Sequence, residues 1–207
     1  MPTGSLPVTV DPDVSVFALV QRLPRQATFV HQRRTMQLIS YEIENGCLVD
    51  GARTRIFSAF QYMSKFLPQV KRYEQLAARA EAVYVFGVPD VTPPPIPGVR
   101  YIWLHPESQL AKEWFLVSCG RDYMSALATE EQTRITDPDD QRIFKGIWSF
   151  DFELVTILND WLSNLVHASS FTIDEQDRNL NQQVRLMSQS MARLVARLPN
   201  ERKRQNT

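Results

Sequence analysis

Two short apolar runs separated by a proline-rich segment constrain the fold more than any other part of the sequence. Residues 83–88 (VYVFGV) and 99–104 (VRYIWL) are rich in β-branched and aromatic residues, a composition typical of buried strands. The segment between them contains prolines at positions 93–95, followed by Pro97 and Gly98. Because proline fixes φ and lacks an amide hydrogen, this segment is a stiff connection rather than a helix or a strand. We therefore expect the two strands at the centre of a sheet, with an exposed loop at its edge.

Apolar residues at helical spacing predict helices before and after this stretch. Residues 65–80 form such a pattern, interrupted at Pro68, and lead directly into the strand at residues 83–88, which is typical of a βαβ unit. Other helices are predicted at residues 16–23 after the N-cap Ser15, at 35–46 between the N-cap Thr35 and Gly46, and at 152–166 after the N-cap Asp151.

Further strands are predicted at residues 55–60, 113–118, 123–129 and 142–150, with Gly146 as a bulge or a point of close approach. The sequence therefore predicts an α/β fold in which a mixed central sheet is flanked by helices. We expect the strands at residues 55–60, 113–118 and 142–150 to be neighbours of the central pair.

The last helix, expected from about Thr172 to Leu198, has a different pattern. Its apolar residues alternate at spacings of four and three, as in the a and d positions of a heptad repeat, with Ile173 in phase. This narrow stripe favours a dimeric coiled coil over a helix docked on its own domain. The dimerisation residues predicted from it are Leu180, Val184, Met187, Met191, Leu194 and Leu198.

These patterns divide the chain into four parts. We expect a flexible leader at residues 1–13, an α/β domain at 14–168, a dimerisation and signalling helix at 172–198, and a disordered tail at 199–207.

Composition excludes several classes of protein. Lysine plus arginine and aspartate plus glutamate number 23 each, and this balance argues against a dedicated nucleic-acid binder. No apolar run is long enough to insert into a membrane, and the first residues lack the pattern of a secretory signal. Cys47 and Cys119 are far apart, so we expect two buried, reduced thiols in a cytoplasmic protein.

No familiar catalytic motif occurs, and no catalytic residue, metal ligand or cofactor is assigned. The three histidines, His31, His105 and His167, are dispersed over different predicted elements. The acidic pairs Glu130–Glu131 and Asp139–Asp140 lie in or beside a polar loop, where we expect solvated charges rather than a buried acid–base pair.

Three groups of residues remain as candidates for binding. The basic segment at residues 31–35 could bind an anion at the start of a helix, or could be an ordinary solvated turn. Aromatic residues on the predicted strands could line a ligand pocket, or could simply pack the sheet. The proline loop could be a binding edge or only a stiff connection. The ligand-binding candidates are His31, Arg33, Arg34, Tyr101, Trp114 and Trp148, and the partner-binding candidates are Pro94, Pro95 and Pro97.

The chain resembles the DICT sensory domain of diguanylate cyclases and two-component proteins over about residues 14–167. The matching segments, in order, are residues 33–44, 55–61, 72–90, 93–101, 113–117 and 144–151. The resemblance implies a non-catalytic sensory module of bacterial, especially cyanobacterial, signal transduction with a role in light responses. It also implies a signalling partner such as a histidine kinase, a response regulator or a diguanylate cyclase.

Three functional hypotheses follow. The first is a sensory module that forms a homodimer through its last helix, and the second is an interaction or assembly factor that binds no small molecule. The third is an enzyme that uses Arg33, Arg34 and a histidine on an anionic substrate, and it ranks last because no nucleophile–base pair is visible. Covalent attachment of a chromophore at Cys47 or Cys119 is not expected, since neither cysteine lies in a supporting motif.

Overall fold

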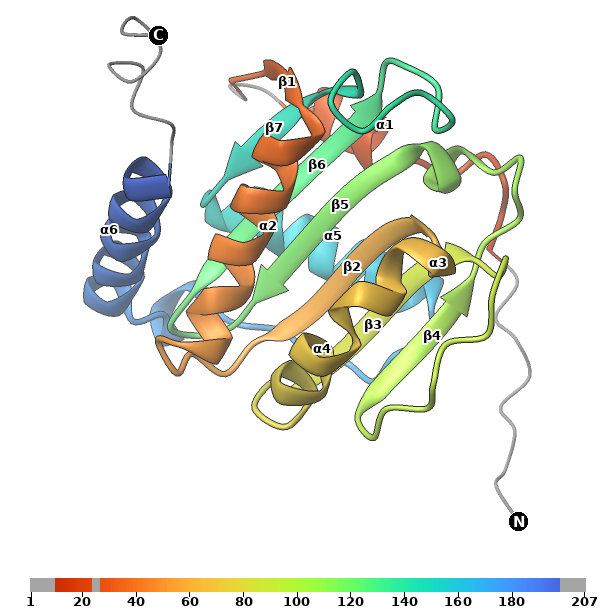
Figure 1. Ribbon diagram of the computed structural model, residues 1–207. Helices are drawn as coiled ribbons and strands as arrows, with labels where there is room; N and C mark the ends of the chain where they lie inside the picture. Colours follow the sequence, from red (N-terminus) through yellow and green to blue (C-terminus); the bar gives the residue numbers. More distant parts are fainter. Residues whose placement is uncertain (1–9, 24–26, 198–207) are drawn as a thin grey trace, which may run out of the picture.

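A computed structural model of the chain describes residues 10–23 and 27–197, with the arrangement drawn in Figure 1. The strands are β1 (Phe29–Gln32), β2 (Arg55–Tyr62), β3 (Ala82–Val88), β4 (Val99–Trp103), β5 (Glu113–Cys119), β6 (Met124–Glu131) and β7 (Ile143–Ser149). The α-helices are α1 (Val16–Gln21), α2 (Arg33–Leu48), α3 (Met63–Phe66), α4 (Val70–Ala77), α5 (Phe152–Leu165) and α6 (Leu180–Arg197). Short 3-10 turns are η1 (Leu67–Gln69), η2 (Gln109–Lys112) and η3 (Glu175–Asp177).

All seven strands form one mixed sheet in the order β1-β7-β6-β5-β2-β3-β4. Strands β2, β3 and β4 are mutually parallel, whereas the β2–β5, β5–β6, β6–β7 and β1–β7 pairs are antiparallel. The predicted α/β class and the βαβ unit that joins β2 to β3 through α3 and α4 are confirmed.

The proline-bounded strands do not lie at the sheet centre, and this prediction was wrong. Strand β4 is an edge strand, and β5 occupies the middle position of the sheet. Of the three expected neighbours, only β2 pairs with β3, while β5 and β7 lie further across the sheet. An apolar run shows that a strand is buried on both faces, but it does not show how many strands lie beyond it.

Helices cover both faces of the sheet, and Figure 1 shows α2, α3 and α4 on one face and α5 on the other. Because side chains alternate along a strand, Ile56 and Phe57 of β2 enter different cores. Phe57 packs with Phe86 and with helix α5 residues such as Leu158. The opposite face holds one core beneath α3 and α4 and a second core beneath α2.

Strand β1 was not predicted, because its residues are mostly exposed and show no apolar alternation. It is held by antiparallel pairing with β7 at the edge of the sheet. Helix α2 consequently begins at Arg33 after the N-cap Gln32, and the predicted N-cap Thr35 instead hydrogen-bonds His31 Nδ1 at 2.9 Å.

Helix α6 begins at Leu180 rather than near Thr172. Asn179 provides the physical reason, because its side-chain oxygen accepts the amide hydrogen of Gln182 and caps the helix. Ile173 therefore lies outside the helix and packs against the core that contains α5. Leu198, the tail at residues 199–207 and most of the predicted leader lie outside the described residues.

Gly46 does not end helix α2, which continues to Leu48. A Cβ atom at position 46 would lie 2.6 Å from the ring of Tyr123, so the glycine is required for close approach of the helix to this buried side chain. Gly146 was predicted as a point of close approach, and this is confirmed, since a Cβ atom there would lie 2.3 Å from the carbonyl oxygen of Ala128.

Gly46→Ala is expected to destabilise the protein although alanine favours helix by about 1 kcal/mol over glycine. Overlap with the Tyr123 ring is expected to outweigh that gain and to cost about 1–3 kcal/mol in the free energy of unfolding. Urea titration of Gly46→Ala in the wild-type and Tyr123→Leu backgrounds checks this. The glycine substitution should cost less in the Tyr123→Leu background, and an equal cost in both would contradict the explanation.

Candidate functional site

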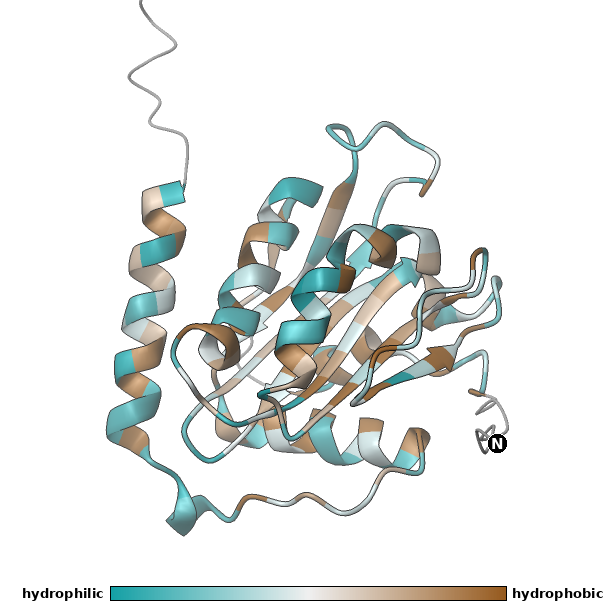
Figure 2. Ribbon diagram, turned by 60° about the horizontal axis from the view of Figure 1, so that its bottom comes forward, coloured by the Kyte–Doolittle hydropathy of each residue, from teal (hydrophilic) through white to brown (hydrophobic). Residues whose placement is uncertain are grey.

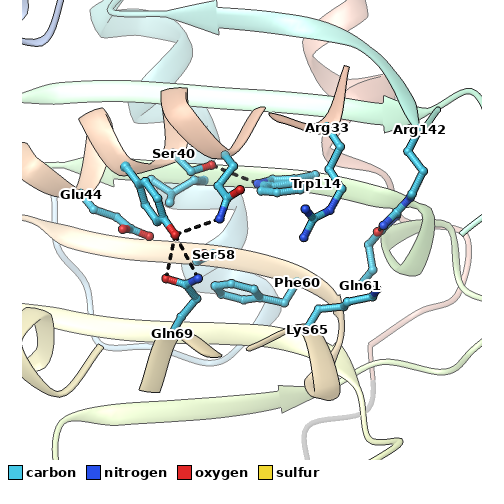
Figure 3. Close-up of a pocket in the computed structure, with 13 residues that line it drawn as sticks. Arg33, Ser40, Glu44, Ser58, Phe60, Gln61, Lys65, Gln69, Trp114 and Arg142 are labelled. Atoms are coloured by element: carbon cyan, nitrogen blue, oxygen red, sulfur yellow. Dashed lines mark hydrogen bonds between the residues drawn. The ribbon is translucent and has the colours of Figure 1, made fainter. Parts of the chain in front are cut away.

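A partly enclosed cavity lies between helix α2, the end of strand β2, the α3–η1 turn and strand β5 (Figure 3). The region open to the centre of a water molecule measures about 40 Å³. A single water occupies roughly 10–15 Å³ of such a cavity, so there is room for more than one water molecule. Its lining residues are Arg33, Gln37, Ser40, Tyr41, Glu44, Ser58, Phe60, Gln61, Lys65, Gln69, Trp114, Leu116 and Arg142.

An irregularity at the end of β2 shapes one wall of the cavity. Gln61 has φ +61°, a left-handed conformation that is uncommon outside glycine, and the register between β2 and β3 shifts between Ala59 and Tyr62. The Gln61 side chain is held on both sides, since its Oε1 accepts from Arg142 at 2.6 Å and its Nε2 donates to Glu131 at 2.8 Å. These bonds hold the strained residue in one orientation.

Arg142 forms the charged centre of this wall. Its side chain is 1% exposed and makes two hydrogen bonds, both of 2.7 Å, to the two carboxylate oxygens of Glu131. The Glu131 side chain is itself only 4% exposed, so the prediction that this acidic residue is solvated was wrong. A bidentate pair of this kind orients both side chains and leaves Arg142 with little unpaired charge.

The far end of the cavity is polar and includes one buried carboxylate, that of Glu44. The Tyr41 hydroxyl accepts hydrogen bonds from Gln37 at 2.9 Å and from Gln69 at 3.1 Å. Beside it, Glu44 is buried and pairs with Arg72, and the Tyr73 hydroxyl lies 2.9 Å from its Oε1. Burial raises the pKa of the Glu44 carboxyl, while Arg72 opposes that shift.

The near end is aromatic and cationic. The Arg33 guanidinium lies 5.7 Å from the centre of the Trp114 ring, and the Trp114 indole donates to Ser40 Oγ at 3.0 Å. Phe60 lines the opposite side, held by edge contacts to Phe66 and Tyr73. Figure 3 shows Arg33, Trp114, Phe60 and Lys65 around the same space.

Of the six ligand-binding candidates, Arg33 and Trp114 line the cavity. His31 lies on the exposed strand β1, and Arg34 is exposed on the first turn of α2. Tyr101 stacks on Trp103 at the β4 edge with a ring separation of 5.8 Å, and Trp148 packs on Phe150 at 5.1 Å. Tyr101 and Trp148 therefore pack against other aromatic side chains. This was the alternative interpretation of the aromatic residues on the predicted strands.

Several lining residues could not be identified from the sequence. Gln61, Gln69 and Arg142 reach the cavity from separate segments, and no motif spacing connects them. The left-handed conformation of Gln61 had no sequence signal either, since glycine and asparagine are the usual markers of that conformation.

Other reactive groups have structural roles. Cys47 and Cys119 are buried, as predicted, and burial raises the pKa of their thiols to about 11 and about 12. Glu113 is also buried, with a pKa raised to about 7 by burial, and its oxygens accept from Ser15 Oγ and from the Val16 amide at the start of α1. Within residues 10–23 and 27–197, no three histidine, cysteine or acidic side chains form a metal-binding group.

The proline loop connects parallel strands β3 and β4 without a helix. Pro94, Pro95 and Pro97 are exposed, whereas Ile96 between them is buried under α4. Asp90, at the start of the loop, accepts the amide hydrogen of Ser64 at 2.9 Å and thereby fixes the first turn of α3 beside the cavity.

Helix α6 docks on the domain through a face that is largely polar. Gln183, Leu186 and Ser190 are its buried residues, and Gln183 makes two hydrogen bonds with the backbone of Met124. Arg193 donates to Glu42 of α2 at 2.6 Å and to both oxygens of Asp50, and Arg197 lies 2.9 Å from Glu42. We call Glu42, Asp50, Arg193 and Arg197 the α2–α6 clasp.

Most of the predicted heptad residues that the structure describes lie beside this docked face rather than within it. Leu180, Val184 and Met191 are 59%, 56% and 38% exposed, and Val195 is 67% exposed. Leu194, by contrast, packs partly against the core beneath α2. Figure 2 shows brown residues on α6, which stands at the side of the domain. We call Leu180, Val184, Met187, Met191 and Val195 the apolar stripe.

Replacement of Arg142 with methionine is expected to cost about 3–5 kcal/mol in the free energy of unfolding, because it leaves the buried Glu131 carboxylate unpaired. Denaturant titration checks this, with Arg134→Met, at an exposed position of the nearby loop, as the matched control. A loss in Arg142→Met no greater than in Arg134→Met would contradict the assigned role.

Residues 13–132 match the family DICT, described as a sensory domain in diguanylate cyclases and two-component systems. No curated protein sequence matches. Among solved structures, polyphosphate kinase from Porphyromonas gingivalis is similar at 14% sequence identity and a TM-score of 0.40, over 87% of this chain and 31% of the kinase chain. A TM-score of 0.40 does not establish a common fold.

The family match covers more than half of the chain and includes five of the six segments that carry the sequence resemblance, since residues 144–151 lie beyond it. The described helices include none that is long and apolar enough to cross a membrane. The chain belongs to the DICT family of sensory domains.

Proposed function

We propose that this chain is the input module of a signalling system, in which the cavity receives a small-molecule signal and the apolar stripe of α6 transmits it. The observation that carries the proposal is the position of α2. Gln37, Tyr41 and Glu44 of this helix line the cavity, while Glu42 of the same helix pairs with α6. A change in α2 on ligand binding would therefore act directly on the clasp.

A second copy of the chain is the proposed occupant of the apolar stripe. The stripe retains heptad spacing over most of its length, and Leu180, Val184, Met191 and Val195 are exposed although the helix is already docked by its other face. A heptad seam is complementary to itself, which suits a symmetric dimer. The proposed partners of the dimer are a histidine kinase, a response regulator or a diguanylate cyclase in the cytoplasm of a bacterium, and a cyanobacterial light response is the proposed setting.

An interaction factor without a small-molecule ligand is the second candidate function. It is favoured by the exposed Pro94, Pro95 and Pro97 next to the unpaired edge of β4. Stiff prolines lose little entropy on binding, and an open strand edge offers backbone groups to a partner. Purified protein that binds no small molecule but retains a stable protein partner through this loop would favour this candidate.

Val184→Glu combined with Met191→Glu is expected to convert the dimer into a monomer, because both charges would enter an apolar interface. Sedimentation equilibrium of the full chain measures the mass. The control is Gln189→Glu, which adds a charge on α6 away from the stripe and should leave the dimer intact. A wild-type chain that is already monomeric, or a double variant that stays dimeric, would reject the stripe as the dimer surface.

Arg193→Gln is expected to loosen α6 without unfolding the sheet, since among the described residues it leaves the buried Glu42 with Arg197 as its ion-pair partner. The loss is expected to be about 2–4 kcal/mol for the local opening of α6. Hydrogen exchange should become faster in α6 amides and stay unchanged in α4. Arg185→Gln, on an exposed position of the same helix, is the control, and equal exchange in both variants would show that the clasp does not hold α6.

A further inference from the structure

We propose that the cavity binds a small planar organic acid, with its acidic group between Arg33 and Lys65 and its ring against Trp114. This inference rests on the proposed sensory function, since it assigns a chemical class to the input site. The charge, the aromatic surface and the polar far end of the cavity each favour such a ligand.

The charge at the near end favours an anion. Arg33 makes one ion pair, at 3.3 Å, with Asp139, whose side chain is 57% exposed and therefore strongly solvated. Lys65 is exposed at the cavity mouth and has no ion-pair or hydrogen-bond partner within the described part of the chain. Arg142 is different, because Glu131 already neutralises it. Two weakly compensated cations that line one cavity are suited to binding a carboxylate or phosphate group.

The aromatic walls of the cavity favour a ligand whose acidic group is attached to a flat apolar ring. Trp114 and Phe60 line the cavity from β5 and β2, and Figure 3 shows both rings near the Arg33 guanidinium. Each ring is held in place, Trp114 by its bond to Ser40 and Phe60 by its edge contact with Phe66 at 5.2 Å. Fixed aromatic walls bind a planar ring with little loss of side-chain entropy.

The polar far end favours a hydrogen-bonding group opposite the acid. Tyr41, Gln37 and Gln69 form a connected set of hydroxyl and amide groups there, with Glu44 beside them. Amides and a hydroxyl can exchange a mutual hydrogen bond for one to a ligand at small cost. The cavity is small, so the ring is expected to be single rather than fused.

Calorimetric titration of the full chain tests this class of ligand with three probes. The first is 4-hydroxybenzoate, which carries an acid, one ring and an opposite hydroxyl. The second, 4-hydroxybenzamide, has the same shape without charge, and the third is inorganic phosphate, which has charge without a ring. We expect saturable binding of 4-hydroxybenzoate and at least about tenfold weaker binding of 4-hydroxybenzamide, because loss of a charge-assisted hydrogen bond costs this much. Inorganic phosphate should also bind at least about tenfold more weakly, because it makes no contact with the aromatic walls.

Variants locate the binding site. Arg33→Gln and Lys65→Gln should each weaken 4-hydroxybenzoate binding by about tenfold, and Trp114→Phe should weaken it with the fold intact. Arg134→Gln removes an exposed positive charge away from the cavity lining and should bind as the wild type does. Thermal unfolding of each variant shows that it is folded at the titration temperature, and Lys65→Gln, at an exposed position, is the variant least able to disturb folding.

The outcomes separate this inference from the proposed function. Equal binding of acid and amide, equal binding in Arg33→Gln and Arg134→Gln, or no binding of 4-hydroxybenzoate at millimolar concentration overturns the acid as ligand, whatever the dimer measurements show. Binding of phosphate as tight as that of 4-hydroxybenzoate overturns the role of the ring. If the acid binds with the expected selectivity but leaves hydrogen exchange in α6 unchanged, the ligand class stands and the proposed route of signalling fails.

Discussion

Two buried carboxylates on one helix determine how this molecule is assembled. Glu42 and Glu44 of α2 are almost completely buried, and they point away from each other toward different parts of the chain. A buried carboxylate is tolerated only when a cation or several hydrogen bonds compensate it. Arg72 from α4 compensates Glu44 beside the cavity, and Arg193 with Arg197 from α6 compensates Glu42. The position of α4 and that of α6 are therefore both tied to α2.

This constraint explains why α6 presents apolar residues to solvent. A helix that docks by hydrophobic burial would turn its apolar stripe inward. Here the docked face carries Gln183, Ser190 and Arg193, which are matched by backbone groups and acidic side chains. The stripe is left beside that face, with residues such as Val184 and Val195 exposed.

Sequence reasoning succeeded where local patterns decide the structure and failed where distant residues meet. Apolar runs located the strands, and Asp151 and Ser15 cap α5 and α1 as predicted. Strand β1 was missed because edge pairing needs only backbone groups. Gly46 was predicted to end a helix. Its real role, close contact with Tyr123, joins residues far apart in the chain and leaves no local signal. Arg33 and Trp114 were predicted as ligand-binding candidates in two separate groups, and both line the cavity, but Gln61, Gln69 and Arg142 reach it through the topology of the fold and carry no local signal.

The energy available from a small ligand is sufficient for the proposed transmission. A ligand can shift an equilibrium only by its difference in affinity for the two states. Micromolar binding supplies about 8 kcal/mol, and opening a buried ion pair costs roughly 3–5 kcal/mol. Separating Glu42 from Arg193 through a displacement of α2 would therefore use only part of the ligand's binding free energy. Because Tyr41 and Glu42 are adjacent on α2, even a small rotation of the helix moves the cavity wall and the clasp together.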